Sequence, residues 1–288
     1  MKAARASNIH RLAELLHHGG DPNIQNEDGN TALTLAAWHG YTEASHLLVT
    51  SGADPNIQDI DGYTALIVSA REGHTGAARV LLTNGADPDI QDENGDTALI
   101  EAASRGSAEV ARLLVANGAD LNIQGVNGCT ALIRAAREDH TGVAQVLLTN
   151  GADPNIQDMD GNTALIWAAL YDCQEVARLL AMNGADTNIQ DAKGDTALIW
   201  AAWYGQIDVA QVLLTNGANP DVQNKRGLTA LILAAGKGHY SVLNLLLHAH
   251  AEHFGHYSDV PRAVVGDDVM NDVIQIGGGG LSKKRERS

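Results

Sequence analysis

Cysteine and aromatic residues are scarce in this chain, which has two Cys, four Trp, six Tyr and one Phe among 288 residues. Cys129 and Cys173 stand at non-equivalent places of the repeated pattern described below, so we expect no structural disulfide. Two cysteines without a disulfide framework fit a reducing compartment. No apolar run approaches the roughly 18 residues that a membrane-spanning helix needs. Residues 1–20 contain no continuous apolar segment, and we expect no signal peptide there.

Positive charge is also scarce. Lys and Arg number 19 against 35 Asp and Glu, which gives a formal net charge of −16 at pH 7. Proteins bind nucleic-acid backbones largely by neutralising phosphates with Lys and Arg. The composition therefore argues against a nucleic-acid partner, and the lack of apolar runs argues against a membrane partner.

Catalytic motifs are missing as well. The sequence contains no G-x-S-x-G, no Walker loop, no G-x-G-x-x-G after a strand and no H-E-x-x-H. Many carboxylates recur with the repeat, and one loop place holds Asp54, Asp87, Asp120, Asp153 and Asp186. Such recurrence is typical of a structural role. We predict that the chain is not an enzyme and binds no cofactor or metal.

What the chain has instead is one segment of about 33 residues repeated in tandem. A representative copy, residues 191–223, reads DAKGDTALIWAAWYGQIDVAQVLLTNGANPDVQ. The other copies start at Asn26, Asp59, Asp92, Gly125, Asp158 and Asn224, and residues 1–25 resemble a truncated copy. A fixed period of this size predicts stacked units, a solenoid rather than a globule.

Each copy is expected to form a turn, two helices and an extended loop. Gly194 at the fourth place suits a turn with positive φ, and Thr196 suits an N-cap. ALIWAAWYG then predicts a first helix and VAQVLLTN a second, with Gly217 as its left-handed C-cap. Steps of 100° per residue place Leu198 and Ala202 on one apolar stripe, which neighbouring repeats must bury.

The pattern D-x-x-G-x-T-A-L-x-x-A-A-x-x-G…L-L-x-x-G-A-D-x-N is similar to the ankyrin repeat over residues 1 to 250. The resemblance implies an all-α solenoid of stacked helix-turn-helix units with short hairpin-like loops. The family usually has Pro after the Thr and a His two places later, whereas this chain has Ala197 and Ile199. The hydrogen bonds of that His between repeats are therefore missing, and we expect apolar packing to replace them.

The repeats set the expected domain boundaries. Residues 1–25 are a truncated capping repeat in which Leu12, Leu15 and Leu16 face the first full repeat. Seven repeats fill residues 26–250, and residues 251–288 form a tail that we expect to be largely disordered. Within the tail, residues 260–276 could form one short helix, and KKRER is either a nuclear-localisation patch or plain disorder.

Two repeats depart from the pattern at the end of the first helix. Asp139 and Asp172 stand where the other repeats have Gly. Asp tolerates the left-handed conformation better than most residues, so we expect both to adopt it.

One face of the first helices is expected to be the functional surface. The stepping that buries Leu198 turns the third, sixth and seventh residues after Ala197 outward together. In repeats five and six these residues are Trp167, Leu170, Tyr171, Trp200, Trp203 and Tyr204. In earlier repeats the same places hold Arg105, Arg134, Arg137 and Glu138, which we expect to form a charged flank.

Exposed Trp and Tyr beside Arg is the composition of an interface hot spot. In proteins resembling ankyrin repeats, these faces line a concave groove that grips a partner. We therefore predict a monomeric scaffold or adaptor that binds another protein through these ten residues. Alternatively, the tail covers the aromatic residues, or they are bare surface.

Two other function classes stay open. In a sensor of nucleotides or small ligands, Trp203 and Tyr204 would stack on a base while Arg134 or Arg137 takes a phosphate. In a regulatory subunit, the chain would act only with a catalytic partner. We expect a cytoplasmic protein, with a nuclear location or delivery as a secreted effector left open.

Several Asn and His residues fit either a modification or metal site or a structural role. Asn56, Asn122, Asn155 and Asn188 lie in L-x5-D-x-N segments similar to those that asparaginyl hydroxylases modify, but Asn also favours turns. His74, His140 and His239 open second helices, which indicates a structural role. His248, His250, His253 and His256 could offer metal ligands, but a surface histidine run is the preferred interpretation.

Overall fold

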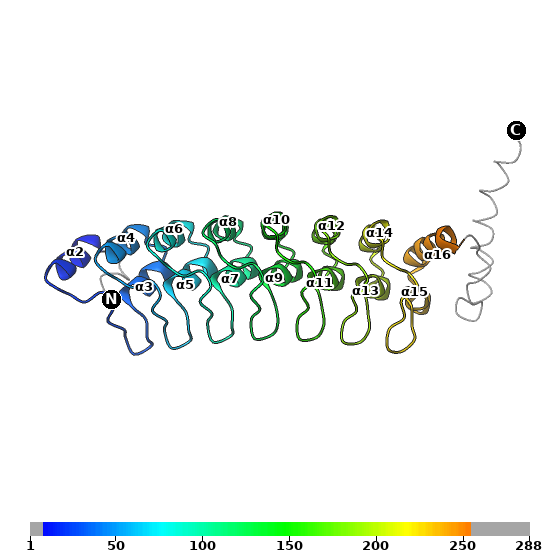
Figure 1. Ribbon diagram of the computed structural model, residues 1–288, viewed down its shortest axis with the longest axis horizontal. Coiled ribbons are helices and arrows are strands. Elements are labelled where there is room, and N and C mark those ends of the chain that lie inside the picture. The colour runs from blue at the N-terminus through cyan, green and yellow to red at the C-terminus, as the bar shows by residue number, and fades with distance from the viewer. Residues whose placement is uncertain (1–7, 255–288) are drawn as a thin grey trace, which may run out of the picture. The chain divides into compact units, whose positions relative to one another are not determined.

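The computed structural model describes residues 8–254, where every regular element is a helix (Figure 1). The chain divides into two compact units, Met1–Ala164 and Leu165–Ser288. The fifteen helices of the described part are one leading helix and seven consecutive pairs, which confirms the prediction of an all-α ankyrin-type solenoid.

The helices of the first unit are α2 (Ile9–His17), α3 (Ala32–Trp38), α4 (Thr42–Thr50), α5 (Ala65–Arg71), α6 (Thr75–Thr83), α7 (Ala98–Ser104), α8 (Ala108–Ala116), α9 (Ala131–Arg137) and α10 (Thr141–Thr149). First helices pack on first helices, from α3 through α5 and α7 to α9. Second helices pack likewise from α4 to α10, and α2 packs on α4. The two helices of each repeat thus belong to two layers (Figure 1).

The second unit continues the same order. After α11 (Ala164–Leu170), which begins at the boundary, come α12 (Gln174–Met182), α13 (Ala197–Tyr204), α14 (Ile207–Thr215), α15 (Ala230–Lys237) and α16 (Tyr240–Phe254). Here α13 packs on α15, and α14 packs between α12 and α16. Helix α16 runs past the boundary expected at residue 250. The segment 260–276 and KKRER lie outside the described residues.

Local chemistry explains where the first helices begin and end. Thr196 accepts a hydrogen bond from the backbone N–H of Ile199 at 3.3 Å, and its backbone is extended, as in an N-cap. Gly205 ends α13 with a φ of 76°. Asp139 and Asp172 have φ of 56° and 60°, so the expectation of left-handed aspartates is confirmed.

The core consists of small and branched side chains at fixed places of the repeat. Ala201 and Ala202 are fully buried, which lets neighbouring first helices approach closely. Ile199 is only 2% exposed, so apolar packing does replace the histidine of the family pattern. Full burial of such a side chain contributes about 1.5–3 kcal/mol.

One expectation about the N-terminal cap was wrong. Leu12 is buried and Leu16 is half-buried, but Leu15 is 43% exposed. The equivalent leucines of full repeats, such as Leu48 and Leu213, are fully buried. Each full repeat has a first helix beside this place, whereas no first helix precedes α2 in the described residues. Within the described residues, Leu15 therefore lacks the first-helix neighbour that covers the equivalent leucines.

Hydrogen bonds between repeats tie the turns together. Gln58 Nε2 donates to the carbonyl of Gly62 in its own turn at 2.7 Å and to the carbonyl of Gln91 in the next repeat at 2.9 Å. The same pair of bonds is made by Gln25, Gln91, Gln124 and Gln190. This ladder holds the turn tips in register, so that side chains at one place of successive repeats line a common edge.

Candidate functional site

The six apolar residues expected on the functional surface, here called the aromatic face (Trp167, Leu170, Tyr171, Trp200, Trp203 and Tyr204), belong to α11, α13 and the turn after α11. The two tyrosines are the most open, with 55% of Tyr171 and 51% of Tyr204 exposed. The three tryptophans and Leu170 are half-buried. The stripe opposite to them, Leu198 and Ala202, is buried as the helical stepping predicts.

Contacts within their own repeats fix Trp167 and Trp200. Trp200 stacks on Tyr204 with ring centroids 6.1 Å apart, and Trp167 stacks on Tyr171 at 5.7 Å. Trp200 Nε1 also donates to Asp191 Oδ2 at 3.0 Å. Asp191 is 8% exposed, and its Oδ1 accepts the backbone N–H groups of Lys193 and Asp195 at 2.8 Å. Trp200 therefore supports the turn tip as well as the face.

A hollow of about 490 Å³ opens beside the aromatic face. Its walls are Trp200, Trp203 and Leu233, and its rim carries the cations Lys193, Lys225 and Arg226. Two lysines cover the rings: Lys193 Nζ lies 5.1 Å from the Trp200 centroid, and Lys237 Nζ lies 3.7 Å from that of Trp203. These cations were not predicted from the sequence, because they come from turns and from the following repeat.

The charged residues predicted for the surface lie in the first unit. Arg134 is half-buried and pairs with Asp96 at 3.3 Å. Arg137 Nε lies 3.6 Å from Glu138. Arg105 caps the end of α7 and is exposed. Arg134 is thus engaged in an internal ion pair rather than free for a ligand.

Acidic groups around Arg134 are less well satisfied than their counterparts in repeat six. Asp92 is 6% exposed, and its Oδ2 has no hydrogen-bond partner. The equivalent Asp191 bonds to Trp200, whereas the place of Trp200 is held here by Glu101. Burial raises the pKa of Glu101, against the opposing effect of Arg71, and the nearby charges of Asp96 and Asp92 raise it further.

Asp96 shows a second departure. Its Oδ1 has no partner, although the equivalent Asp195 Oδ1 accepts from Asn224 Nδ2 at 2.7 Å. The place of Asn224 is held by Gly125, which has no side chain to donate. Burial raises the pKa of Asp96, and the Arg134 guanidinium opposes this rise. Repeat three therefore holds two buried carboxylates, Asp92 and Asp96, each with one oxygen that lacks a donor.

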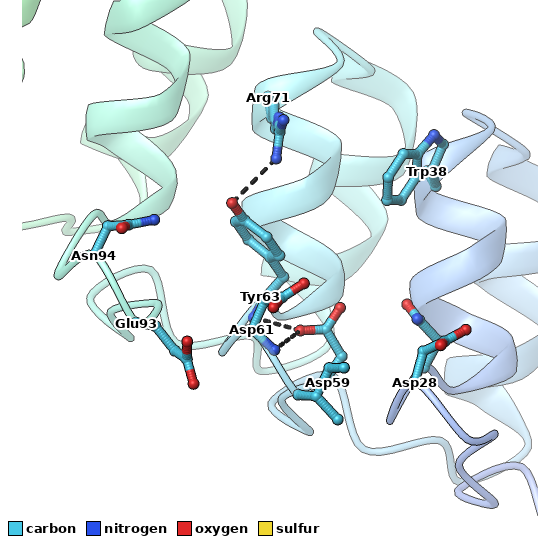
Figure 2. Close-up of a pocket in the computed structure, with 10 residues that line it drawn as sticks. Asp28, Trp38, Asp59, Asp61, Tyr63, Arg71, Glu93 and Asn94 are labelled. Carbon is cyan, nitrogen blue, oxygen red and sulfur yellow. Dashed lines mark hydrogen bonds between the residues drawn. The ribbon is translucent and has the colours of Figure 1, made fainter.

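A second hollow, of about 600 Å³, lies in the first unit (Figure 2). Its aromatic residues are Trp38, at the end of α3, and Tyr63, at a turn tip. Arg71 Nη1 donates to Tyr63 Oη at 3.1 Å, and its guanidinium carbon lies 5.4 Å from the ring centroid. The acidic lining residues are Asp28, Asp59, Asp61 and Glu93. Trp38 was not predicted as part of a site, although it stands at the place that Trp203 occupies in its own repeat.

The asparagines of the L-x5-D-x-N segments join one repeat to the next. Asn56 Nδ2 donates to the carbonyl of Gly85 at 3.2 Å, and Asn56 Oδ1 accepts from the N–H of Asp87 at 2.8 Å. Asn188 makes the same two bonds, and Asn122 Oδ1 accepts from Asp153. Asn155 occupies the equivalent place. These asparagine side chains therefore link successive repeats. The expectation was that they stabilise the turn of their own repeat. Hydroxylation remains a prediction.

The histidines that open second helices also join repeats. His74, His140 and His239 lie 3.1–3.2 Å by Nε2 from the carbonyls of Trp38, Ser104 and Trp203. His248, His250 and His253 belong to α16, whereas His256 lies outside the described residues. In the part of the chain that the structure covers, no group of His, Cys, Asp and Glu is arranged to hold a metal ion.

Both cysteines are buried and neither forms a disulfide, and burial raises the pKa of the Cys129 thiol. Among the helices described, none is long and apolar enough to cross a membrane.

Comparison with known proteins gives a family and a structural relative. The family model for ankyrin repeats matches residues 1–92, 76–158, 127–191, 150–224 and 185–256. Among solved structures, the chain is similar to the ankyrin repeat domain of Bcl-3, a member of the IkappaB protein family. The two are 30% identical with a TM-score of 0.69, over 76% of this chain and 99% of that one. No curated protein sequence matches.

Proposed function

The chain belongs to the ankyrin repeat family, and we propose that it is a non-enzymatic scaffold or adaptor that binds a partner protein through the aromatic face. Ankyrin repeats are in general protein–protein interaction modules. The particular surface and the adaptor role are our proposal.

The proposal rests on Tyr171 and Tyr204, whose rings are exposed to solvent but already held in place. Each tyrosine is more than half exposed and stacks on a half-buried tryptophan. A side chain that is fixed before binding loses little conformational entropy when a partner covers it. Burying such apolar area gives about 25 cal/mol per Å² before the costs of association.

The hollow beside the face adds specificity. Its apolar walls can take a side chain of the partner, and its cationic rim of Lys193, Lys225 and Arg226 favours acidic groups around that side chain. A partner segment with an apolar anchor and acidic neighbours fits this arrangement.

The nucleotide-sensor alternative is less well supported. Lys237 already lies over the Trp203 ring, and Tyr204 packs against Trp200. Arg134, one of the two arginines proposed for the phosphate, is paired with Asp96. No contact of the described residues favours the third alternative, a regulatory subunit.

The test is a paired affinity capture with quantitative mass spectrometry. Baits are the wild type, a Tyr171→Ser/Tyr204→Ser variant and a Tyr240→Ser control, since Tyr240 is 61% exposed and lies at the start of α16. Trp200 stays in place because it supports the turn tip. We expect a protein that binds the wild type and the control but not the double variant. Equal capture by all three baits would contradict the proposal.

A further inference from the structure

The two hollows are equivalent sites of the repeat pattern with opposite charge. Trp38 and Trp203 stand at the same place of repeats one and six, and His74 and His239 contact the carbonyls of these tryptophans from the following repeats. The turn tips that line both hollows are also equivalent. The backbone frame is therefore repeated, and the differences lie in the side chains.

Three cations of the second unit correspond to three acids of the first. Lys193 corresponds to Asp28, Arg226 to Asp61, and Lys237 to Glu72. Asp28, Asp61 and Glu72 are all exposed. The basic hollow of the second unit thus has an acidic counterpart in the first.

The change at Glu72 determines what lies over the tryptophan. Lys237 Nζ lies 3.7 Å from the Trp203 centroid. Trp38 is 45% exposed, and no Lys or Arg of the described residues lies over its ring. An open indole face beside several carboxylates attracts a cation through both the ring quadrupole and the charges.

Arg71 does not neutralise the carboxylates that line the hollow. Arg71 donates to Tyr63 and is the only basic residue among those that line the hollow, against the acids Asp28, Asp59, Asp61 and Glu93. Figure 2 shows Arg71 directed to Tyr63 and Trp38 extending from the neighbouring helix. Negative charge therefore remains in excess in the hollow that Trp38 lines.

We propose that the acidic hollow of the first unit binds a lysine side chain of a partner protein, with its ammonium over Trp38 as Lys237 lies over Trp203. The carboxylates of Asp28 and Asp61 supply the opposite charge. A lysine fits because the chain itself uses lysine at the equivalent place. This site does not depend on the aromatic face, and its occupant has the opposite charge to the acidic groups expected at the other hollow.

The test uses the indole N–H signals of the full chain in NMR spectra. The Trp38 signal is assigned with Trp38→Phe. The probe is the peptide Ac-Gly-Ser-Lys-Gly-Ser-NH2, and the control peptide has norleucine in place of lysine. We expect the Trp38 signal to shift and saturate with the lysine peptide alone, and the shift to shrink as salt is raised.

Matched variants separate the site from the overall charge. Glu72→Lys supplies the chain's own lysine over Trp38, and Asp28→Lys/Asp61→Arg installs the residues that the second unit carries at these places. Both should weaken peptide binding at least fivefold and still fold. Glu43→Lys makes the same charge change at an exposed place on α4 and should leave binding unchanged.

Several results would overturn the proposal. They are a Trp38 signal that does not move, an equal shift with the norleucine peptide, and an equal loss of binding in Glu43→Lys. A Trp38 shift that follows protein concentration without peptide would assign the site to a second copy of this chain instead of a partner. The signals of Trp200 and Trp203 report separately on the aromatic face, so failure of one site does not imply failure of the other.

Discussion

Replacing Trp200 by Phe tests whether the aromatic face also holds the turn tip. Phenylalanine keeps the ring over Tyr204 but removes the Nε1 donor to Asp191 Oδ2, a bond of 3.0 Å. Asp191 is 8% exposed, so water replaces that donor poorly. A buried acceptor left without a partner costs about 1–3 kcal/mol. We expect Trp200→Phe to lower the free energy of unfolding by this amount in urea titrations followed by circular dichroism.

Trp203→Phe is the matched control. No hydrogen bond of the Trp203 indole is found among the described residues, and the ring loses only part of its attraction to Lys237, at most about 1 kcal/mol. Asp191→Asn completes a double-mutant cycle, because asparagine is the natural residue at this place in repeats one and seven. The cycle should give a coupling of about 1 kcal/mol or more between Trp200 and Asp191. The reasoning is refuted if Trp200→Phe costs no more than Trp203→Phe, or if the cycle shows no coupling.

Three further substitutions test the local accounts. Burial raises the pKa of Glu101, so its contribution to stability is largest below about pH 4 and is lost as pH rises through the folded pKa. Glu101→Gln should therefore be more stable than wild type at neutral pH. In urea titrations its free energy of unfolding should also fall less between acid and neutral pH. Asp139→Gly should raise the free energy of unfolding by up to about 1 kcal/mol, because glycine adopts a left-handed φ without strain, while Glu138→Gly beside it should lower that free energy. Thr196→Ala should cost about 1 kcal/mol in the same titrations, and Thr196→Ser should restore most of it.

The fold could be predicted from the sequence because the same local signals recur at the same places of each repeat. The turn glycines, the capping threonines and the left-handed aspartates act within a few residues of themselves. Ile199 is buried because its place on the helix faces the neighbouring repeat. Such features need only the period and the helical step.

The features that were not predicted depend on contacts between repeats or, for Leu15, on the lack of a preceding first helix in the described residues. Lys237 covers Trp203 from the next repeat, and Arg134 reaches back to Asp96 in the preceding repeat. Neither pairing is visible when one helix is considered alone. Leu15 is exposed because no first helix precedes α2 in the described residues.

The role of Trp38 could have been predicted from the sequence, since Trp38 stands at the same place of its repeat as Trp203. Alignment of all the copies, followed by a comparison of charges place by place, identifies the acidic hollow. The volume of the hollow and the direction of Arg71 required the structure.

We propose that Tyr171 and Tyr204 provide most of the binding energy for a partner protein. Isothermal titration calorimetry with the purified captured partner tests it most directly, using wild type, Tyr171→Ser/Tyr204→Ser and Tyr240→Ser with matched unfolding midpoints. Two hot-spot side chains of at least about 1 kcal/mol each predict a Kd at least about tenfold weaker for the double variant and no change for Tyr240→Ser. An unchanged Kd in the double variant would contradict the account.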